Sequence, residues 1–104
     1  MEIIKTLEHY DTFTSQGQNI VVFSAQWCRD CLFIHPHLPA IEAKFPKWKF
    51  AYVDRDDLLA LCKDLDIYGI PSFLAIKEGE IIGRLISKER KTPTEIERFI
   101  SDLK

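Results

Sequence analysis

Two cysteines separated by two residues, in the stretch Trp27-Cys28-Arg29-Asp30-Cys31, constrain this chain more than any other feature. The run before them, Asn19 to Ser24, is short, β-branched and aromatic, which is typical of a buried strand. The apolar residues after them recur at steps near three and four, which is typical of a helix. A pair at such a junction places one sulfur on the exposed first turn of the helix and the other one turn below. Such a pair can open and close as a disulfide.

The start of a helix favours an anion, because its first N–H groups lack partners and the helix dipole is positive there. Cys28 is expected at this start, so it is the candidate for the reactive thiolate. Cys31 is expected to lie one turn further in and to be less exposed. His35 shares the helix face of Cys31 and is a candidate to exchange a proton with it, the alternative being a purely structural histidine.

Two other interpretations of the cysteine pair are weaker. A tetrahedral zinc site needs about four ligands, and no second Cys-x-x-Cys and no correctly spaced His pair accompanies the first pair. The remaining candidate ligands are Cys62, His9, His35 and His37. A buried, inert pair conflicts with the charged insert Arg29-Asp30, which indicates that the loop meets water. Cys62, among leucines, is expected to be a small core residue, and His9 an ordinary residue of a helix face.

Composition favours a globular protein without nucleic-acid or membrane partners. The 104 residues are 46% hydrophobic and 29% charged, and one domain over residues 1–104 is expected. The net charge of −2, without a lysine or arginine block, provides no electrostatic footprint for nucleic acid. No apolar run is long enough to cross a membrane, and the N-terminus lacks the pattern of a signal peptide. A cytoplasmic protein is therefore expected, in which three cysteines are not a disulfide scaffold.

The first half of the chain predicts a strand–helix–strand unit with parallel strands. Ile3 and Ile4 are expected to form a short edge strand, followed by a helix from Thr6, its N-cap, to Gln16. The helix from Arg29 to Phe45 contains Pro36 and Pro39, so a kink is expected near residues 35–39. The next strand covers residues 50–54, and Asp54 or Asp56 is expected to cap the helix at residues 57–65.

The second half predicts a hairpin and a final helix. A strand that begins at Pro71 and a second strand over residues 80–87 are separated by Glu78-Gly79, which predicts an antiparallel pair. Pro71 removes a backbone donor at the strand start and is a candidate for a cis peptide bond. Thr92-Pro93-Thr94-Glu95 is a capping box that opens the last helix.

Taken together, Trp27-Cys28-Arg29-Asp30-Cys31 and Gly69-Ile70-Pro71 resemble the thioredoxin family, and the resemblance extends over nearly the whole chain. Pro36, Asp54 and the turn at residues 77–80 also match the family pattern. The resemblance implies an α/β architecture, the thioredoxin fold, with a central mixed sheet of four to five strands flanked by four helices. It agrees with the elements expected from periodicity.

The resemblance also implies roles for the site residues. Cys28 is expected to attack a substrate disulfide and Cys31 to resolve the product. Trp27 borders the site, and Pro71, cis in the family, lies against the dithiol. Ile70 offers its backbone to an extended substrate segment, which pairs with it as an added strand would.

The sequence departs from the family pattern in three places. Arg29-Asp30 replaces a Gly-Pro insert and so belongs to the supporting residues of the site, as His35 does. Val22 stands where the family has a buried acid, and Phe50 where it has a lysine. The acid and the lysine are linked in the family to proton transfer at the resolving cysteine, so His35 or water is expected to substitute for them.

The sequence thus predicts a monomeric thiol-disulfide oxidoreductase that works through Cys28 and Cys31 and needs no metal or other cofactor. Its partners are expected to be protein disulfide substrates and a reductase or low-molecular-weight thiol as electron donor. One alternative is a redox-inactive binding module of the same fold, whose groove at Ile70 and Pro71 holds an extended peptide. A zinc-binding protein is the weaker alternative.

Overall fold

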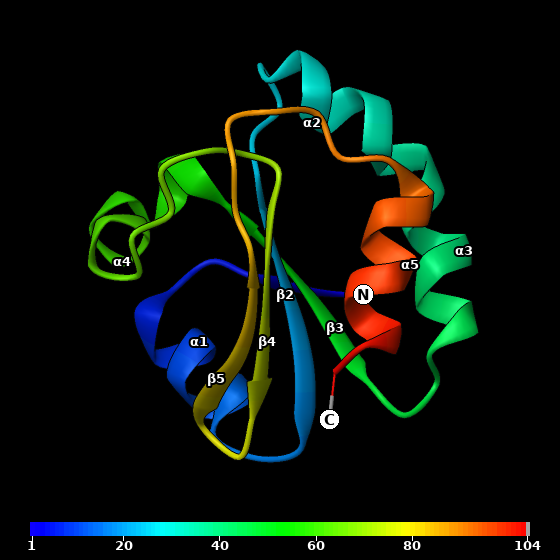
Figure 1. Cartoon of the computed structure of the whole chain (residues 1–104). Coiled ribbons are helices and arrows are strands. Elements are labelled where there is room, and N and C mark those ends of the chain that lie inside the picture. The colour runs from blue at the N-terminus through cyan, green and yellow to red at the C-terminus, as the bar shows by residue number, and fades with distance from the viewer. Residues whose placement is uncertain (104) are drawn as a thin grey trace.

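A five-stranded mixed sheet forms the centre of the molecule, in the strand order β1-β3-β2-β4-β5 (Figure 1). The structure is a computed structural model that describes residues 1–103. Strands β1, β3 and β2 are parallel, whereas β4 is antiparallel to β2 and β5 is antiparallel to β4. The strands are β1 (Glu2–Ile4), β2 (Gln18–Ser24), β3 (Lys49–Asp54), β4 (Ser72–Lys77) and β5 (Glu80–Leu85).

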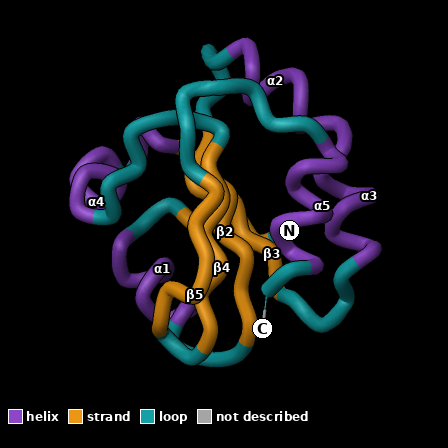
Figure 2. Tube along the Cα trace, viewed as in Figure 1, coloured by secondary structure: helices purple, strands orange, loops and turns teal. Residues whose placement is uncertain are grey.

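Helices cover both faces of the sheet. The helices α2, α3 and α5 lie on one face, and α1 and α4 lie on the other (Figures 1 and 2). They are α1 (Leu7–Thr14), α2 (Arg29–Ile34), α3 (Leu38–Lys44), α4 (Leu59–Asp64) and α5 (Pro93–Ser101). Because α2 and α3 are the two parts of the single long helix expected from the sequence, the prediction of a mixed sheet flanked by four helices is confirmed.

The alternation of side chains along the central strand divides the core into two layers. Ile20 and Val22 of β2 pack with α2, α3 and α5, while Val21 and Phe23 pack with α1 and α4. All four side chains are fully buried, as expected for a strand with helices on both of its faces. This buried strand ends at Ser24, shortly before the cysteine pair, and so fixes the position of the loop that carries it.

The expected kink in the long helix is confirmed. Helix α2 ends at Ile34, a 3-10 turn covers His35–His37, and α3 begins at Leu38. Pro36 and Pro39 cause this break, because each lacks the N–H that an α-helical hydrogen bond requires. The break leaves a six-residue α2 at the end of the sheet that carries the cysteines.

Three helix starts test the predictions of caps. Thr6 accepts a hydrogen bond from the His9 N–H at 3.1 Å, and Thr92 and Glu95 form the complete capping box. The prediction that Asp54 or Asp56 caps α4 is wrong. The Asp54 carboxylate accepts from the Asp56 N–H at 2.8 Å and so caps a 3-10 turn, which separates it from α4. Among residues 1–103, no side chain caps α4.

The hairpin of β4 and β5 is also confirmed. Glu78 and Gly79 connect the strands with positive φ angles of 50° and 83°. Both angles match the primed turns that fit the twist of a hairpin. Over the described part of the chain, no helix combines the length and the hydrophobicity needed to cross a membrane.

Candidate active site

Cys28 occupies the N-cap position of α2. Its sulfur accepts a hydrogen bond from the Cys31 N–H at 3.3 Å, and its backbone is extended, with φ −87° and ψ 119°. The side chain is partly exposed. The thiolate is the attacking form of a cysteine, and the Cys31 N–H is placed to donate a hydrogen bond to it.

Cys31 lies one turn inside the helix and is 2% exposed, so the expected inward position is confirmed. Burial, together with the neighbouring Cys28, raises the pKa of the Cys31 thiol to about 11. Hydrogen bonds from the Ser24 side chain and the Ala25 backbone act in the opposite direction and lower this pKa. At neutral pH Cys31 therefore carries its proton, and it must lose this proton before its sulfur can attack.

The loop before β4 meets the cysteine loop across the end of the sheet. The Cys28 thiol points at the Ile70 carbonyl oxygen, with a separation of 3.8 Å, and the Ile70–Pro71 peptide bond is cis. Ile70 is half-buried and Pro71 is buried. The cis bond suggested by the sequence is therefore present, and Ile70 and Pro71 lie beside the dithiol.

A second loop, between β5 and α5, packs against the same end of the sheet (Figure 2). A Cβ atom built on Gly69 would lie 2.1 Å from the Ser87 carbonyl oxygen, so only glycine permits this approach. The Tyr68 hydroxyl donates to the Ile86 carbonyl at 3.0 Å. The loops that contain Ile70 and Ser87 thus support each other next to the cysteines.

Trp27 lies at the surface directly before Cys28 and is 62% exposed. Its indole N–H donates to the Asp56 carboxylate at 2.8 Å, and the Arg55 guanidinium lies 5.6 Å from its ring centroid. These contacts anchor one edge of the indole and leave most of its apolar area open to a partner. The tryptophan therefore borders the dithiol, as the resemblance implies.

The insert between the cysteines contacts the loop before α5. The Asp30 carboxylate pairs with Arg90 at 2.9 Å, and the Arg90 guanidinium lies 4.3 Å from the centroid of the Phe33 ring. Arg29 is exposed. Sequence reasoning missed Arg90, because its partner lies 60 positions earlier in the chain and no local pattern connects the two.

Lys91 is a second residue that sequence reasoning missed. It is fully buried, and its ammonium group donates to the carbonyls of Ser87 and Glu89 at 2.6 and 3.0 Å. Burial lowers the pKa of Lys91, while nearby negative groups that include Asp30 and both active-site cysteines act to raise it. A buried cation therefore lies near the dithiol, held by the backbone of its own loop.

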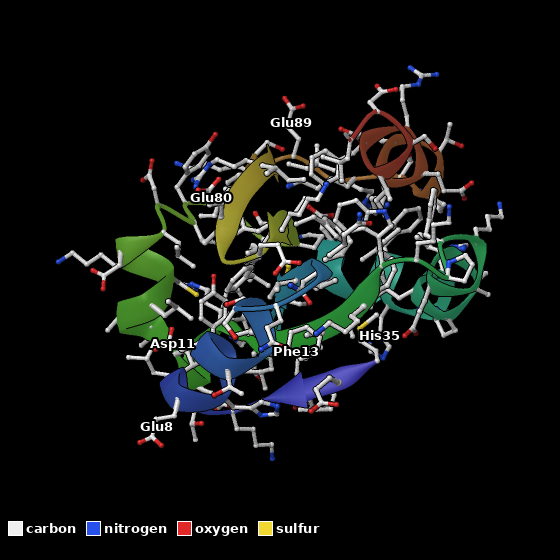
Figure 3. The ribbon with its side chains drawn as sticks, turned by 90° about the horizontal axis from the view of Figure 1, so that it is seen from below. Glu8, Asp11, Phe13, His35, Glu80 and Glu89 are labelled. Atoms are coloured by element: carbon white, nitrogen blue, oxygen red, sulfur yellow. The ribbon has the colours of Figure 1, made fainter. Side chains whose placement is uncertain are left out.

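His35 lies on the 3-10 turn after α2 and is exposed. Its backbone N–H donates to the Cys31 carbonyl, while its ring packs edge-on against Tyr52, with 6.2 Å between the ring centroids. Figure 3 shows it at the molecular surface, near the end of β1. The structure thus brings His35 to the neighbourhood of Cys31 and places its ring against Tyr52.

A pocket of about 940 Å³ reaches the inner side of the dithiol. Its lining includes Ser24, Cys31, His35 and Tyr52. Val22 and Phe50, in contrast, are buried in the apolar core. Ser24 and Tyr52 follow Val22 and Phe50 by two positions on β2 and β3, so they lie on the same face of the sheet as the positions where the family has its acid and its lysine.

Metal binding receives no support. Within residues 1–103, no three His, Cys, Asp or Glu side chains are grouped closely enough to hold a metal ion. His9, one of the candidate ligands, pairs with the Glu2 carboxylate at 2.8 Å, and Cys62, on α4, is buried in the core. The expectation that Cys62 is a core residue is confirmed.

Comparison with known proteins gives a consistent result. The thioredoxin family model matches residues 2–102. Mitochondrial thioredoxin-3 of Saccharomyces cerevisiae is 29% identical over 101 residues, which cover 96% of this chain and 77% of the relative. An H-type thioredoxin of Fagopyrum esculentum is 32% identical over 84 residues, or 80% of this chain and 72% of the relative.

Solved structures agree with this assignment. The oxidised form of yeast mitochondrial thioredoxin 3 superimposes with a TM-score of 0.87 at 26% identity, and covers 99% of this chain and 95% of its own. Fasciola hepatica thioredoxin gives a TM-score of 0.87 at 26% identity, with complete coverage of both chains. Together with the Cys28–Cys31 dithiol of a thiol-disulfide oxidoreductase, these matches show that the chain belongs to the thioredoxin family.

Proposed function

We propose that Cys28 is the attacking cysteine of this oxidoreductase and that Cys31 is the resolving one. The observation that carries this assignment is the difference in exposure of the two sulfurs: Cys28 is partly exposed at the start of α2, whereas Cys31 is buried one turn inside. An incoming disulfide needs access to the attacking sulfur. The resolving sulfur needs only to reach Cys28.

The reaction follows from this arrangement. The Cys28 thiolate attacks one sulfur of a substrate disulfide, a mixed disulfide forms, and the other substrate sulfur leaves and takes up a proton. Cys31 then loses its proton and attacks Cys28, so that the second substrate sulfur leaves as a thiol. The protein dithiol is oxidised by two electrons, and the substrate disulfide is reduced by two.

The substrates that we propose are disulfides in extended segments of proteins. The half-buried backbone of Ile70 lies beside Cys28 and can pair with such a segment, while Trp27 offers apolar area next to it. One yeast mitochondrial relative has been solved in work on the thiol-resolving mechanism of a 1-Cys peroxiredoxin, which supports a protein as partner. A reductase or a low-molecular-weight thiol returns the electrons.

Other parts of the proposal concern the supporting residues and the state of the protein. Pro71 and Trp27 shape the surface around Cys28, and Asp30, held by Arg90, fixes the insert, with Arg29 beside it.

One sheet with a core layer on each face supports a single domain over residues 1–104, acting as a monomer. The cytoplasmic location stays a prediction, because one relative is a mitochondrial protein.

Reduction of insulin in the presence of dithiothreitol tests the proposal. We expect turnover by the wild-type protein, and no rate above that of dithiothreitol alone for Cys28→Ser, because the attacking sulfur is absent. Cys62→Ser is the matched control, and it should retain activity, since Cys62 is buried in the core away from the dithiol. Wild-type protein without activity in this assay would instead favour a redox-inactive peptide-binding module.

A further inference from the structure

Resolution requires a buried thiol to lose a proton. Cys31 is 2% exposed, and Val22 and Phe50, which occupy the family's acid and lysine positions, carry no group that can accept a proton. The expected substitute, His35, is exposed and packs its ring on Tyr52. The proton of Cys31 therefore needs another route to solvent.

Ser24 and Tyr52 provide polar groups between Cys31 and the pocket. Val22 is paired with Tyr52 and Ser24 with Asp54, so Ser24 and Tyr52 are diagonal neighbours on the face of the sheet that α2 covers. Ser24 is 4% exposed, and its side chain is close enough to the Cys31 thiol and the Tyr52 phenol to lower the pKa of both groups. Tyr52 is half-buried and lines the 940 Å³ pocket together with Ser24 and Cys31.

We propose that the proton of Cys31 leaves through the Ser24 hydroxyl and the Tyr52 phenol to water in the pocket. This proposal rests on the assignment of Cys31 as the resolving cysteine. A hydroxyl both accepts and donates a hydrogen bond, so two of them in sequence can pass a proton without becoming charged. Ser24 contacts the reacting thiol, and Tyr52 acts through Ser24 as a positioning residue.

The step is balanced. The Cys31 thiol gives its proton to the Ser24 oxygen. At the same time the Ser24 hydroxyl gives its own proton to the Tyr52 oxygen, and the Tyr52 phenol gives its proton to water. The Cys31 thiolate then attacks the Cys28 sulfur of the mixed disulfide, the Cys28–Cys31 bond forms, and the substrate thiolate leaves and takes a proton from solvent. Over the whole reaction the Cys28–Cys31 dithiol is oxidised by two electrons and the substrate disulfide is reduced by two.

Other charged groups face the same region. His35, Asp54, Asp57, Lys5 and Glu42 line the pocket, whereas Lys91 does not line it but interacts electrostatically with both cysteines. Asp54 caps the 3-10 turn, and Glu42 pairs with the terminal ammonium of Met1 at 3.2 Å. These groups set the local field, whereas Ser24 is the side-chain hydroxyl whose proximity lowers the pKa of Cys31.

The proposal can be tested with the reduced full chain and dithiobis(2-nitrobenzoate). This reagent releases its first chromophore when Cys28 attacks, in a phase that depends on reagent concentration. It releases the second when Cys31 resolves the adduct, in a first-order phase. Stopped-flow measurements over roughly pH 6 to 10, on both sides of the pKa of about 8.5 of a free thiol, separate the two phases and follow the rising ionisation of Cys31.

We expect Ser24→Ala to slow the second phase about tenfold, the effect of one pKa unit at Cys31, and to move its pH profile to higher pH. Tyr52→Phe keeps the ring against His35 and should slow the same phase about fivefold, as expected for one lost hydrogen bond. Both variants should leave the first phase unchanged. Tyr10→Phe, which removes a phenol hydroxyl from the core layer on the opposite face of the sheet, is the matched control and should alter neither phase.

The outcomes are distinguishable. The relay is overturned if Ser24→Ala and Tyr52→Phe both keep the wild-type rate and pH profile of the second phase. It is also overturned if His35→Gln slows the second phase and these two variants do not. Slowing of both phases together, with a lowered melting temperature, also overturns it, because it indicates a structural defect. If the assignment of the cysteines is itself wrong, Cys28→Ser rather than Cys31→Ser keeps the first phase, whatever stands at position 24 or 52.

Discussion

Replacement of Cys31 by serine should convert the protein into a trap for its substrates, whereas replacement of Cys28 should leave it unable to form any adduct at the dithiol. Only Cys28 is exposed to an incoming disulfide, so Cys31→Ser is still attacked once. The variant then lacks the intramolecular thiol whose high effective concentration ends the intermediate. Mixed disulfides should therefore accumulate from Cys31→Ser and disappear when dithiothreitol is added.

Non-reducing electrophoresis and mass spectrometry of both variants, mixed with a protein disulfide, measure this difference. The substitutions should leave both variants folded, because a dithiol that opens in every cycle cannot be the main support of the core. Circular dichroism provides that control. Equal amounts of adduct from the two variants would contradict the assigned roles, and no adduct from Cys31→Ser would favour the peptide-binding alternative.

Replacement of Phe73 by alanine should cause a large loss of stability. Phe73 is fully buried on β4, is paired with Val22 of β2 and Leu85 of β5, and packs in the layer beneath α2, α3 and α5. Truncation of a buried phenylalanine to alanine costs about 3–5 kcal/mol, because apolar burial is lost and a cavity remains. Domains of this size have a free energy of unfolding of about 5–15 kcal/mol, so the loss is a large fraction of the total.

Urea unfolding followed by circular dichroism measures this change. The matched control is Ile81→Ala on β5, because Ile81 is 40% exposed and its truncation should cost much less. A loss for Phe73→Ala below about 1.5 kcal/mol, the range of a volume-conserving core substitution, would show that the layer beneath α2 is less tightly packed than described.

The elements near the dithiol could be predicted from the sequence because their signals are local. The apolar run before Cys28, the two prolines after Cys31 and the residues of the capping box each specify a strand, a break or a helix start within a few positions. Asp54 shows the limit of such signals. Its carboxylate was close enough in sequence to cap α4, but it accepts a hydrogen bond from a nearer backbone donor, the Asp56 N–H, instead.

The contacts that complete the site could not be predicted because they join distant parts of the chain. Arg90 reaches Asp30, and Gly69 approaches Ser87, only once the loops at one end of the sheet have been brought together. Lys91 follows the charged residues of an exposed loop, and nothing in its local pattern indicates that it is buried. His35 has the right spacing from Cys31, but Pro36 breaks the helix and the histidine ring lies against Tyr52.

The most direct test of the central claim, that Cys28 and Cys31 form one reversible two-electron couple, is equilibration of the wild-type protein with mixtures of reduced and oxidised glutathione. The mixtures are quenched with acid, the free thiols are alkylated in denaturant so that the buried cysteines react, and the number and position of the labels are found by mass spectrometry. We predict that Cys28 and Cys31 lose their labels together in a single transition, which fits a two-electron curve, while Cys62 stays labelled throughout. Loss of the two labels in separate transitions, or a disulfide that includes Cys62, would contradict the claim.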